Sequence, residues 1–151
     1  MPSPSTPIVN VELRFPATPD NAAQHAALAV DLAMREFDLS LDYTPASVEA
    51  LDAQIDWMRE QGMTTEEVAE PLFALGCYLG EVMVRGLGGR WVPTLRSRLR
   101  GISPWPIVVE LATGATWDPI GKTFKRLELG DSEFLPAFFA EAVAGLQGPA
   151  V

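Results

Sequence analysis

Residues 64–91 constrain the fold more than any other stretch of this chain. They read TTEEVAEPLFALGCYLGEVMVRGLGGRW, with apolar residues on nearly every face of a helix. A helix of this kind is normally buried. Thr64, with Glu67 three residues on, matches a capping box at its start, and the glycine-rich run from Gly86 marks its end. We therefore expect a central helix around which the rest of the chain packs.

Two helices are expected before this segment. The first begins at Thr18-Pro19, because threonine can cap free backbone N–H groups and proline at the first helical position loses no needed donor. The second begins with the same signal at Thr44-Pro45. Their expected core-facing stripes are Ala23, Ala27, Val30, Met34 and Phe37 in the first helix, and Val48, Leu51, Ile55 and Met58 in the second.

Strands are expected at four places. The two-residue alternation of Ile8 to Phe15 predicts a half-buried strand. After the central helix, a strand is expected from Arg90 to Leu95, and the β-branched run from Trp105 to Leu111 predicts another. A turn at residues 113–115 leads to a short strand that ends at Trp117.

Two helices are expected near the C-terminus. Asp118-Pro119 opens a short one that runs to about Arg126, and Asp131 is expected to cap the last one. Pro136 then falls just past the first turn, near the limit of what a helix tolerates. The expected buried side of the last helix is Leu135, Phe138, Phe139, Ala142 and Leu146.

These elements predict a single α+β domain over residues 8–147, with tails at 1–7 and 148–151. A helical N-terminal half of about three helices would pack on a small, mainly antiparallel sheet, with one or two C-terminal helices. Strand order and oligomeric state stay open, although a flat edge such as Ile8 to Phe15 could pair between chains.

The net charge of −9 is distributed unevenly. Residues 1–84 carry three basic and fourteen acidic side chains (−11), residues 85–126 carry eight basic and two acidic (+6), and the last 25 residues add −4. Either the two halves partly neutralise each other, or an acidic face and a basic face each have a partner. The acidic face of the second helix consists of Glu49, Asp52, Asp56 and Glu60.

Composition points to a reducing cytoplasm and excludes several kinds of site. Cys77 is the only cysteine, so no disulfide forms within the chain. The N-terminus lacks a signal-peptide pattern, and the longest uncharged apolar run, residues 71–80, is half of what a bilayer requires. With His25 as the only histidine, neither a zinc site nor a nucleophile with a histidine base is expected. We expect no cofactor and no catalytic residue.

An oxygen-only metal site is the remaining option for a metal. It would use Asp38, Asp42, Glu49, Asp52 and Asp56, but the spacing of a calcium-binding loop is missing. A solvated helix face is the simpler interpretation.

Glu81 is the carboxylate of most interest, because it lies in an otherwise apolar helix. Arg85 follows at i+4, so a structural ion pair is expected and a functional carboxylate is the alternative. A pocket between the third helix and the sheet would account for a small-ligand binder or an enzyme. Its lining would be Tyr78, Glu81, Arg85, Arg90, Trp91 and Trp117, with Lys122 as a further candidate.

Two phosphate-binding interpretations are weaker. TWDPIGKT at 116–123 ends like a Walker A loop, but Thr116 stands where the first glycine belongs and only 28 residues follow Thr123. The basic segment 85–126, with its tryptophans, makes nucleic-acid binding an alternative function. A sequence pI of about 4.5 argues against it.

Three blocks, LGCYLGE (75–81), GGRW (88–91) and WDPIGKTFKR (117–126), resemble an uncharacterised family of small acidic bacterial α+β domains over about residues 40–140. The resemblance implies a fold unit with no assigned activity. Many small acidic bacterial proteins serve as interaction or immunity partners, which is an argument by association. We therefore expect a cytoplasmic, non-catalytic interaction module of the immunity type, whose acidic helices bind a basic protein, with no membrane partner.

Overall fold

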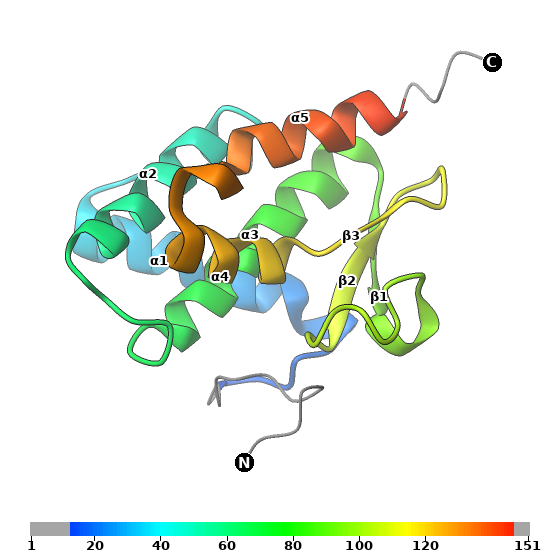
Figure 1. Cartoon of the computed structure of the whole chain (residues 1–151), viewed down its shortest axis with the longest axis horizontal. Coiled ribbons are helices and arrows are strands. Elements are labelled where there is room, and N and C mark those ends of the chain that lie inside the picture. The colour runs from blue at the N-terminus through cyan, green and yellow to red at the C-terminus, as the bar shows by residue number, and fades with distance from the viewer. Residues whose placement is uncertain (1–12, 147–151) are drawn as a thin grey trace.

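The chain has an α+β fold in the computed structural model, which describes residues 13–146. Over this range five α-helices accompany one three-stranded antiparallel sheet. Helix α3 runs through the middle of the molecule, with α2 on one side and the sheet on the other (Figure 1). The α+β class predicted from the sequence is confirmed, and the predicted tails at 1–7 and 148–151 lie outside the described residues.

Helix α3 (Ala69–Leu87) is the buried centre of the fold, as its sequence predicts. Every residue from Leu72 to Met83 is buried. The capping box forms ahead of the helix: Thr64 N–H donates to Glu67 Oε1 at 3.2 Å, and Glu67 N–H donates to Thr64 Oγ1 at 3.3 Å. The helix ends at Gly88, whose φ of 74° is a left-handed conformation that glycine adopts without strain.

Two glycines of α3 allow close packing with later elements. A β-carbon on Gly76 would lie 2.6 Å from the Cα of Ile120, so the backbone of a neighbouring helix occupies that space. At Gly80 the indole ring of Trp91 fills the corresponding space. Glycine at these two positions lowers helix propensity, but it allows the close packing that a larger side chain would prevent.

Helix α1 (Ala22–Phe37) packs against α3 through a different face from the one predicted. A 3₁₀ turn at Pro19–Asn21 precedes it, and the Thr18 side chain makes no capping hydrogen bond. The predicted stripe was wrong, because Ala23, Ala27, Met34 and Phe37 are exposed and Val30 is only half-buried. The buried residues are small, with one histidine among them: Ala22, His25, Ala26, Ala29 and Ala33. Small side chains let α1 approach the bulky surface of α3 closely.

Helix α2 (Ser47–Glu60) follows its prediction in the apolar stripe, since Val48, Leu51, Ile55 and Met58 are all buried. Its first turn is capped from Thr44, whose Oγ1 accepts the Ser47 N–H at 3.3 Å. The outer face of α2 is acidic.

The sheet is a meander of three short strands in the order β1–β2–β3, lying beside the C-terminal part of α3 (Figure 1). Strands β1 (Arg90–Pro93) and β2 (Ile107–Glu110) pair antiparallel, with Trp91 opposite Val109. Strand β3 (Thr116–Trp117) pairs with the end of β2. All three fall within the segments predicted from the sequence.

Two C-terminal helices complete the fold. Helix α4 (Pro119–Leu129) begins where predicted, with Asp118 Oδ1 accepting the Gly121 N–H at 2.9 Å. A 3₁₀ turn, η3 (Gly130–Glu133), separates it from α5 (Leu135–Leu146). Asp131 therefore does not cap α5. Because α5 begins at Leu135, Pro136 lies inside its first turn, where the lack of an N–H costs nothing.

The predicted strand at Ile8 to Phe15 lies largely outside the described residues. Its described part, residues 13–15, is not a strand. Phe15 instead packs edge-on against the His25 ring at 5.6 Å, and the Pro16 carbonyl lies 3.2 Å from His25 Nε2. Among the described residues, none of the helices has both the length and the apolar character needed to cross a bilayer.

Candidate functional site

A groove lies between the outer face of α2 and the turn that joins α4 to α5. We call it the acidic groove, and its volume is about 580 Å³. Helix α2 supplies one wall, α4 the floor, and η3 with the residue after it the other wall. The lining residues are Glu49, Asp52, Ala53, Asp56, Arg126, Asp131 and Phe134.

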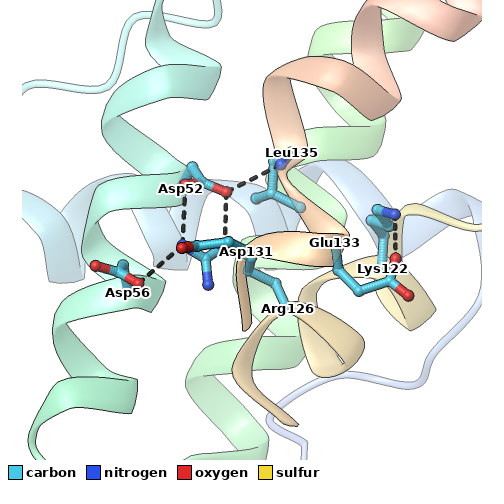
Figure 2. A network of polar contacts seen from close by, with 7 residues as sticks. All are labelled: Asp52, Asp56, Lys122, Arg126, Asp131, Glu133 and Leu135. Carbon is cyan, nitrogen blue, oxygen red and sulfur yellow. Dashed lines mark hydrogen bonds and ion pairs between the residues drawn. The ribbon is translucent and has the colours of Figure 1, made fainter. Parts of the chain in front are cut away.

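Arg126 forms the floor of the groove and is almost wholly buried, with 2% of its side chain exposed. Its Nε donates to Asp52 Oδ1 at 2.9 Å, and its Nη2 donates to Asp56 Oδ1 at 2.9 Å and Asp131 Oδ1 at 3.2 Å (Figure 2). Asp52 Oδ1 also accepts the Leu135 N–H at 2.9 Å. Burial acts to lower the pKa of Arg126, but the hydrogen bonds that its guanidinium donates to Asp52 and Asp56, with the charges of these carboxylates, outweigh burial and raise that pKa. The guanidinium therefore stays charged, with Nε and Nη2 paired, while Nη1 is buried and finds no hydrogen-bond partner among the described residues.

The carboxylates of the groove divide into an inner and an outer set. Asp52 is buried and belongs to Arg126, whereas the side chains of Asp56 and Asp131 are 39% and 94% exposed. Glu49, one helical turn before Asp52 in α2, is exposed. Four carboxylates against one guanidinium leave the lining with a charge of −3. The outer set faces solvent as an anionic surface.

This arrangement can bind cations, and its lining contains no histidine, serine or cysteine. Phe134, 43% exposed, adds an aromatic wall that suits the face of a guanidinium or the stem of a lysine. Among residues 13–146, no group of three or more His, Cys, Asp or Glu side chains is arranged to hold a metal ion. The exposed carboxylates and the aromatic face together suit recognition of positive charge.

The structure places the predicted acidic face with one correction. Glu49, Asp56 and Glu60 lie on the solvent side of α2, but Asp52 is 4% exposed and serves as an internal partner. The sequence prediction missed Asp131 and Phe134, which η3 and the residue after it bring to α2 from far along the chain. Arg126, predicted as part of a basic surface, is instead buried.

The residues predicted to line a ligand pocket fall into separate groups. Glu81 is buried, accepts from Trp91 Nε1 at 2.9 Å, and pairs with Arg85 at 3.3 Å, which places the predicted ion pair as expected. The Tyr78 hydroxyl lies 2.6 Å from Ser47 Oγ. The guanidinium of Arg85 also lies 3.6 Å above the Tyr43 ring, and the Tyr43 N–H donates to the Tyr78 hydroxyl at 2.8 Å, so one continuous set of contacts links these side chains.

The other three predicted pocket residues lie elsewhere. Arg90 pairs with Glu110 across the sheet at 2.9 Å, and Lys122 pairs with Glu133 (Figure 2). Trp117 packs edge-on against Phe138 at 5.4 Å. Each of these side chains has an internal partner that gives it a structural role.

The Walker-like segment has its own anion at the position where a phosphate would bind. Asp118 accepts the Gly121 N–H and the Ser103 hydroxyl, the latter at 2.7 Å. Burial raises the pKa of Asp118, while these hydrogen bonds and nearby Lys125 lower it, and the net direction is upward. The N-terminus of α4 is thus capped by its own carboxylate.

His25 and Cys77 are both buried in the core. The His25 ring lies edge-on to Phe73 at 5.1 Å as well as to Phe15. Burial, with a smaller contribution from Glu81, raises the pKa of the Cys77 thiol. An uncharged, enclosed thiol is a poor nucleophile.

Comparison of the chain with protein-family models, with curated proteins and with solved structures finds no match. The resemblance to small acidic bacterial domains stays a prediction.

Proposed function

We propose that this protein is a non-catalytic interaction module of the immunity type, working in the cytoplasm, and that its acidic groove binds a basic segment of a partner protein. The observation that carries the proposal is the division of the groove carboxylates. Arg126 is buried and pairs with Asp52, Asp56 and Asp131, but its single positive charge leaves the four carboxylates of the groove with a net charge of −3. Glu49, Asp56 and Asp131 remain as a cluster of outward-facing acceptors.

The groove is also pre-organised for binding. Asp56 and Asp131 are both fixed by Arg126, so a partner need not order them. Arginine or lysine side chains of the partner would donate charge-assisted hydrogen bonds to these acceptors and stack on Phe134. Long-range attraction from the acidic α2 face would speed encounter and make it dependent on salt.

An exposed aromatic pair next to this face supports an interaction role. Trp57, 41% exposed on α2, lies edge-on to Phe37 of α1 with ring centroids 5.2 Å apart. Met34, 48% exposed, is a third large apolar side chain on the outside of α1. Exposed aromatic residues among charges are typical of the anchors of protein interfaces.

A site-directed cross-linking experiment tests the proposal. A photo-cross-linking amino acid at Ala53, on the wall of the groove, should capture a partner in lysate of the source organism. The same residue at Ala23, exposed on α1, should not capture it.

The cross-link should disappear at high salt and in a Glu49→Gln/Asp131→Asn variant. An Asp20→Asn/Glu141→Gln variant, with the same change in net charge away from the groove, should retain it. Equal capture from both positions, or capture indifferent to salt, would contradict the proposal.

A further inference from the structure

The longest connection in the fold carries the two most exposed large apolar side chains of the described residues. This arginine loop, residues 94–106, joins β1 to β2 and reads TLRSRLRGISPWP. Leu95 is 75% exposed and Ile102 74% exposed. Single exposed aliphatic side chains are common on protein surfaces, but here two of them share one short loop with three arginines.

The loop is held in shape from within. The Thr94 N–H donates to the Pro106 carbonyl at 3.0 Å, which closes its base, and the Ile102 and Ser103 N–H groups both donate to the Leu99 carbonyl at 2.9 Å. Trp105 anchors it to the core, with its ring 4.4 Å from that of Phe124. Exposure of Leu95 and Ile102 is therefore part of a fixed conformation.

The charge of the loop is entirely positive. Arg96, Arg98 and Arg100 are exposed and no acidic residue lies between 94 and 106. Within residues 13–146, none of the three arginines takes part in an ion pair. In a membrane interface, guanidinium groups bind anionic lipid headgroups, and aliphatic side chains enter the boundary between headgroups and acyl chains. The residues of this loop match both layers.

We propose that the arginine loop docks the protein peripherally on an anionic phospholipid bilayer, with Leu95 and Ile102 entering the interfacial region and the three arginines binding headgroup phosphates. Peripheral contact of this kind needs no spanning helix, and it departs from the sequence-based expectation of no membrane partner.

Nucleic acid fits this loop less well. Binding of single strands relies on aromatic side chains that stack on bases, and Trp105, the one aromatic residue of the loop, is buried. Exposed leucine and isoleucine offer bases nothing comparable.

The acidity of the whole protein does not prevent this docking. The arginine loop, yellow-green at the sheet end in Figure 1, and the acidic helix α2 lie at opposite sides of the molecule. Fixed charges are screened over about 8 Å at physiological ionic strength, so the remote carboxylates act weakly at the membrane. The groove and the loop are also separate enough to be tested independently.

Co-sedimentation with vesicles tests the proposal on the full chain. Wild-type protein should sediment with vesicles of phosphatidylglycerol and phosphatidylcholine and stay in solution with phosphatidylcholine alone. Arg96→Gln/Arg98→Gln/Arg100→Gln should weaken binding about a hundredfold, since each basic residue near such a surface contributes about fivefold. Leu95→Asp/Ile102→Asp should also abolish most binding. Leu129→Asp, at a 56% exposed leucine outside the loop, is the matched control and should bind like wild type.

All substituted positions are exposed, and circular dichroism with a thermal melt verifies that each variant folds. Loss of binding in both loop variants with retention in Leu129→Asp supports docking. Absence of wild-type binding at low salt, or binding that ignores Leu95 and Ile102, overturns it. Binding of a fluorescent oligonucleotide that needs the arginines, with no binding to vesicles, would replace the lipid surface by nucleic acid.

Discussion

Oδ1 of Asp52 accepts two hydrogen bonds at 2.9 Å, one from Nε of Arg126 and one from the backbone N–H of Leu135. One buried carboxylate oxygen thereby joins α2 to the last turns of α4 and to the first residue of α5. The same contacts set the floor of the acidic groove and the position of its far wall.

Arg126→Met should strongly destabilise the protein. Removing the guanidinium leaves Asp52 buried without a cation, which typically costs about 3–5 kcal/mol. Adding Asp52→Asn should recover part of the loss, because asparagine removes the buried charge and keeps an oxygen for the Leu135 N–H. Urea unfolding of the two variants and wild type gives the free energies. A loss below about 1 kcal/mol in Arg126→Met would show that the network is not a structural element.

Gly76→Ala should destabilise the fold, and Gly86→Ala should not. A β-carbon at Gly76 meets the backbone of Ile120, so α4 must shift, and overpacking of this kind costs about 1–3 kcal/mol. Gly86 lies in the same helix, and a β-carbon added there would meet nothing within 4 Å, so alanine should stabilise by up to about 1 kcal/mol. Thermal melts of the pair provide the comparison, and equal midpoints would refute the close contact between α3 and α4.

Asp118→Asn should change how stability depends on pH. Burial raises the folded-state pKa of Asp118 above its unfolded value of 3.8, so the folded state binds more protons between these two pKa values. Stability contributed by this group is then greatest at low pH and falls as pH rises through that window. Asparagine removes this dependence and can still accept from Gly121. Urea midpoints measured from pH 4 to 7 should show wild type losing stability relative to the variant as pH rises; a parallel pair of curves would contradict the shift.

Cys77 should be inert in the native protein. Its thiol is fully buried and its pKa is raised, so little thiolate forms and reagents cannot reach it. A chromogenic disulfide reagent at pH 8 should label it at least about a hundredfold more slowly without denaturant than in concentrated urea. Complete labelling of native protein within minutes would show that the core around α3 opens readily.

Local patterns in the sequence were sufficient for most elements but not for the face of α1. In α2 the large apolar residues are spaced as one stripe, and that stripe is the buried one. In α1 two stripes compete: one contains Val30, Met34 and Phe37, and the other consists of small residues such as Ala26 and Ala33 together with His25. Transfer free energy favours burial of the larger set. The smaller set is buried because α3 presents bulky side chains, and a helix that packs closely on α3 must present small ones.

The acidic groove could be predicted only in part. The α2 carboxylates follow from helical spacing, but the burial of Asp52 depends on Arg126, 74 positions later. A charged residue among other basic residues is ordinarily exposed, so nothing local distinguishes Arg126 from Lys125. The position of Asp131 depends on η3. The sequence predicts that the last helix begins directly after Asp131, but the η3 turn lies between α4 and α5.

We propose that the outer carboxylates of the acidic groove bind a basic segment. The most direct test of this proposal is a titration of ¹⁵N-labelled protein with a hexa-arginine peptide, followed by amide chemical shifts at low and at high salt. We expect chemical-shift changes confined to η3 and to α2 around Glu49 to Asp56. Salt and Glu49→Gln/Asp131→Asn should weaken them, and Asp20→Asn/Glu141→Gln should not. Absence of shifts at low salt, or shifts spread evenly over all acidic surfaces, would contradict the proposal.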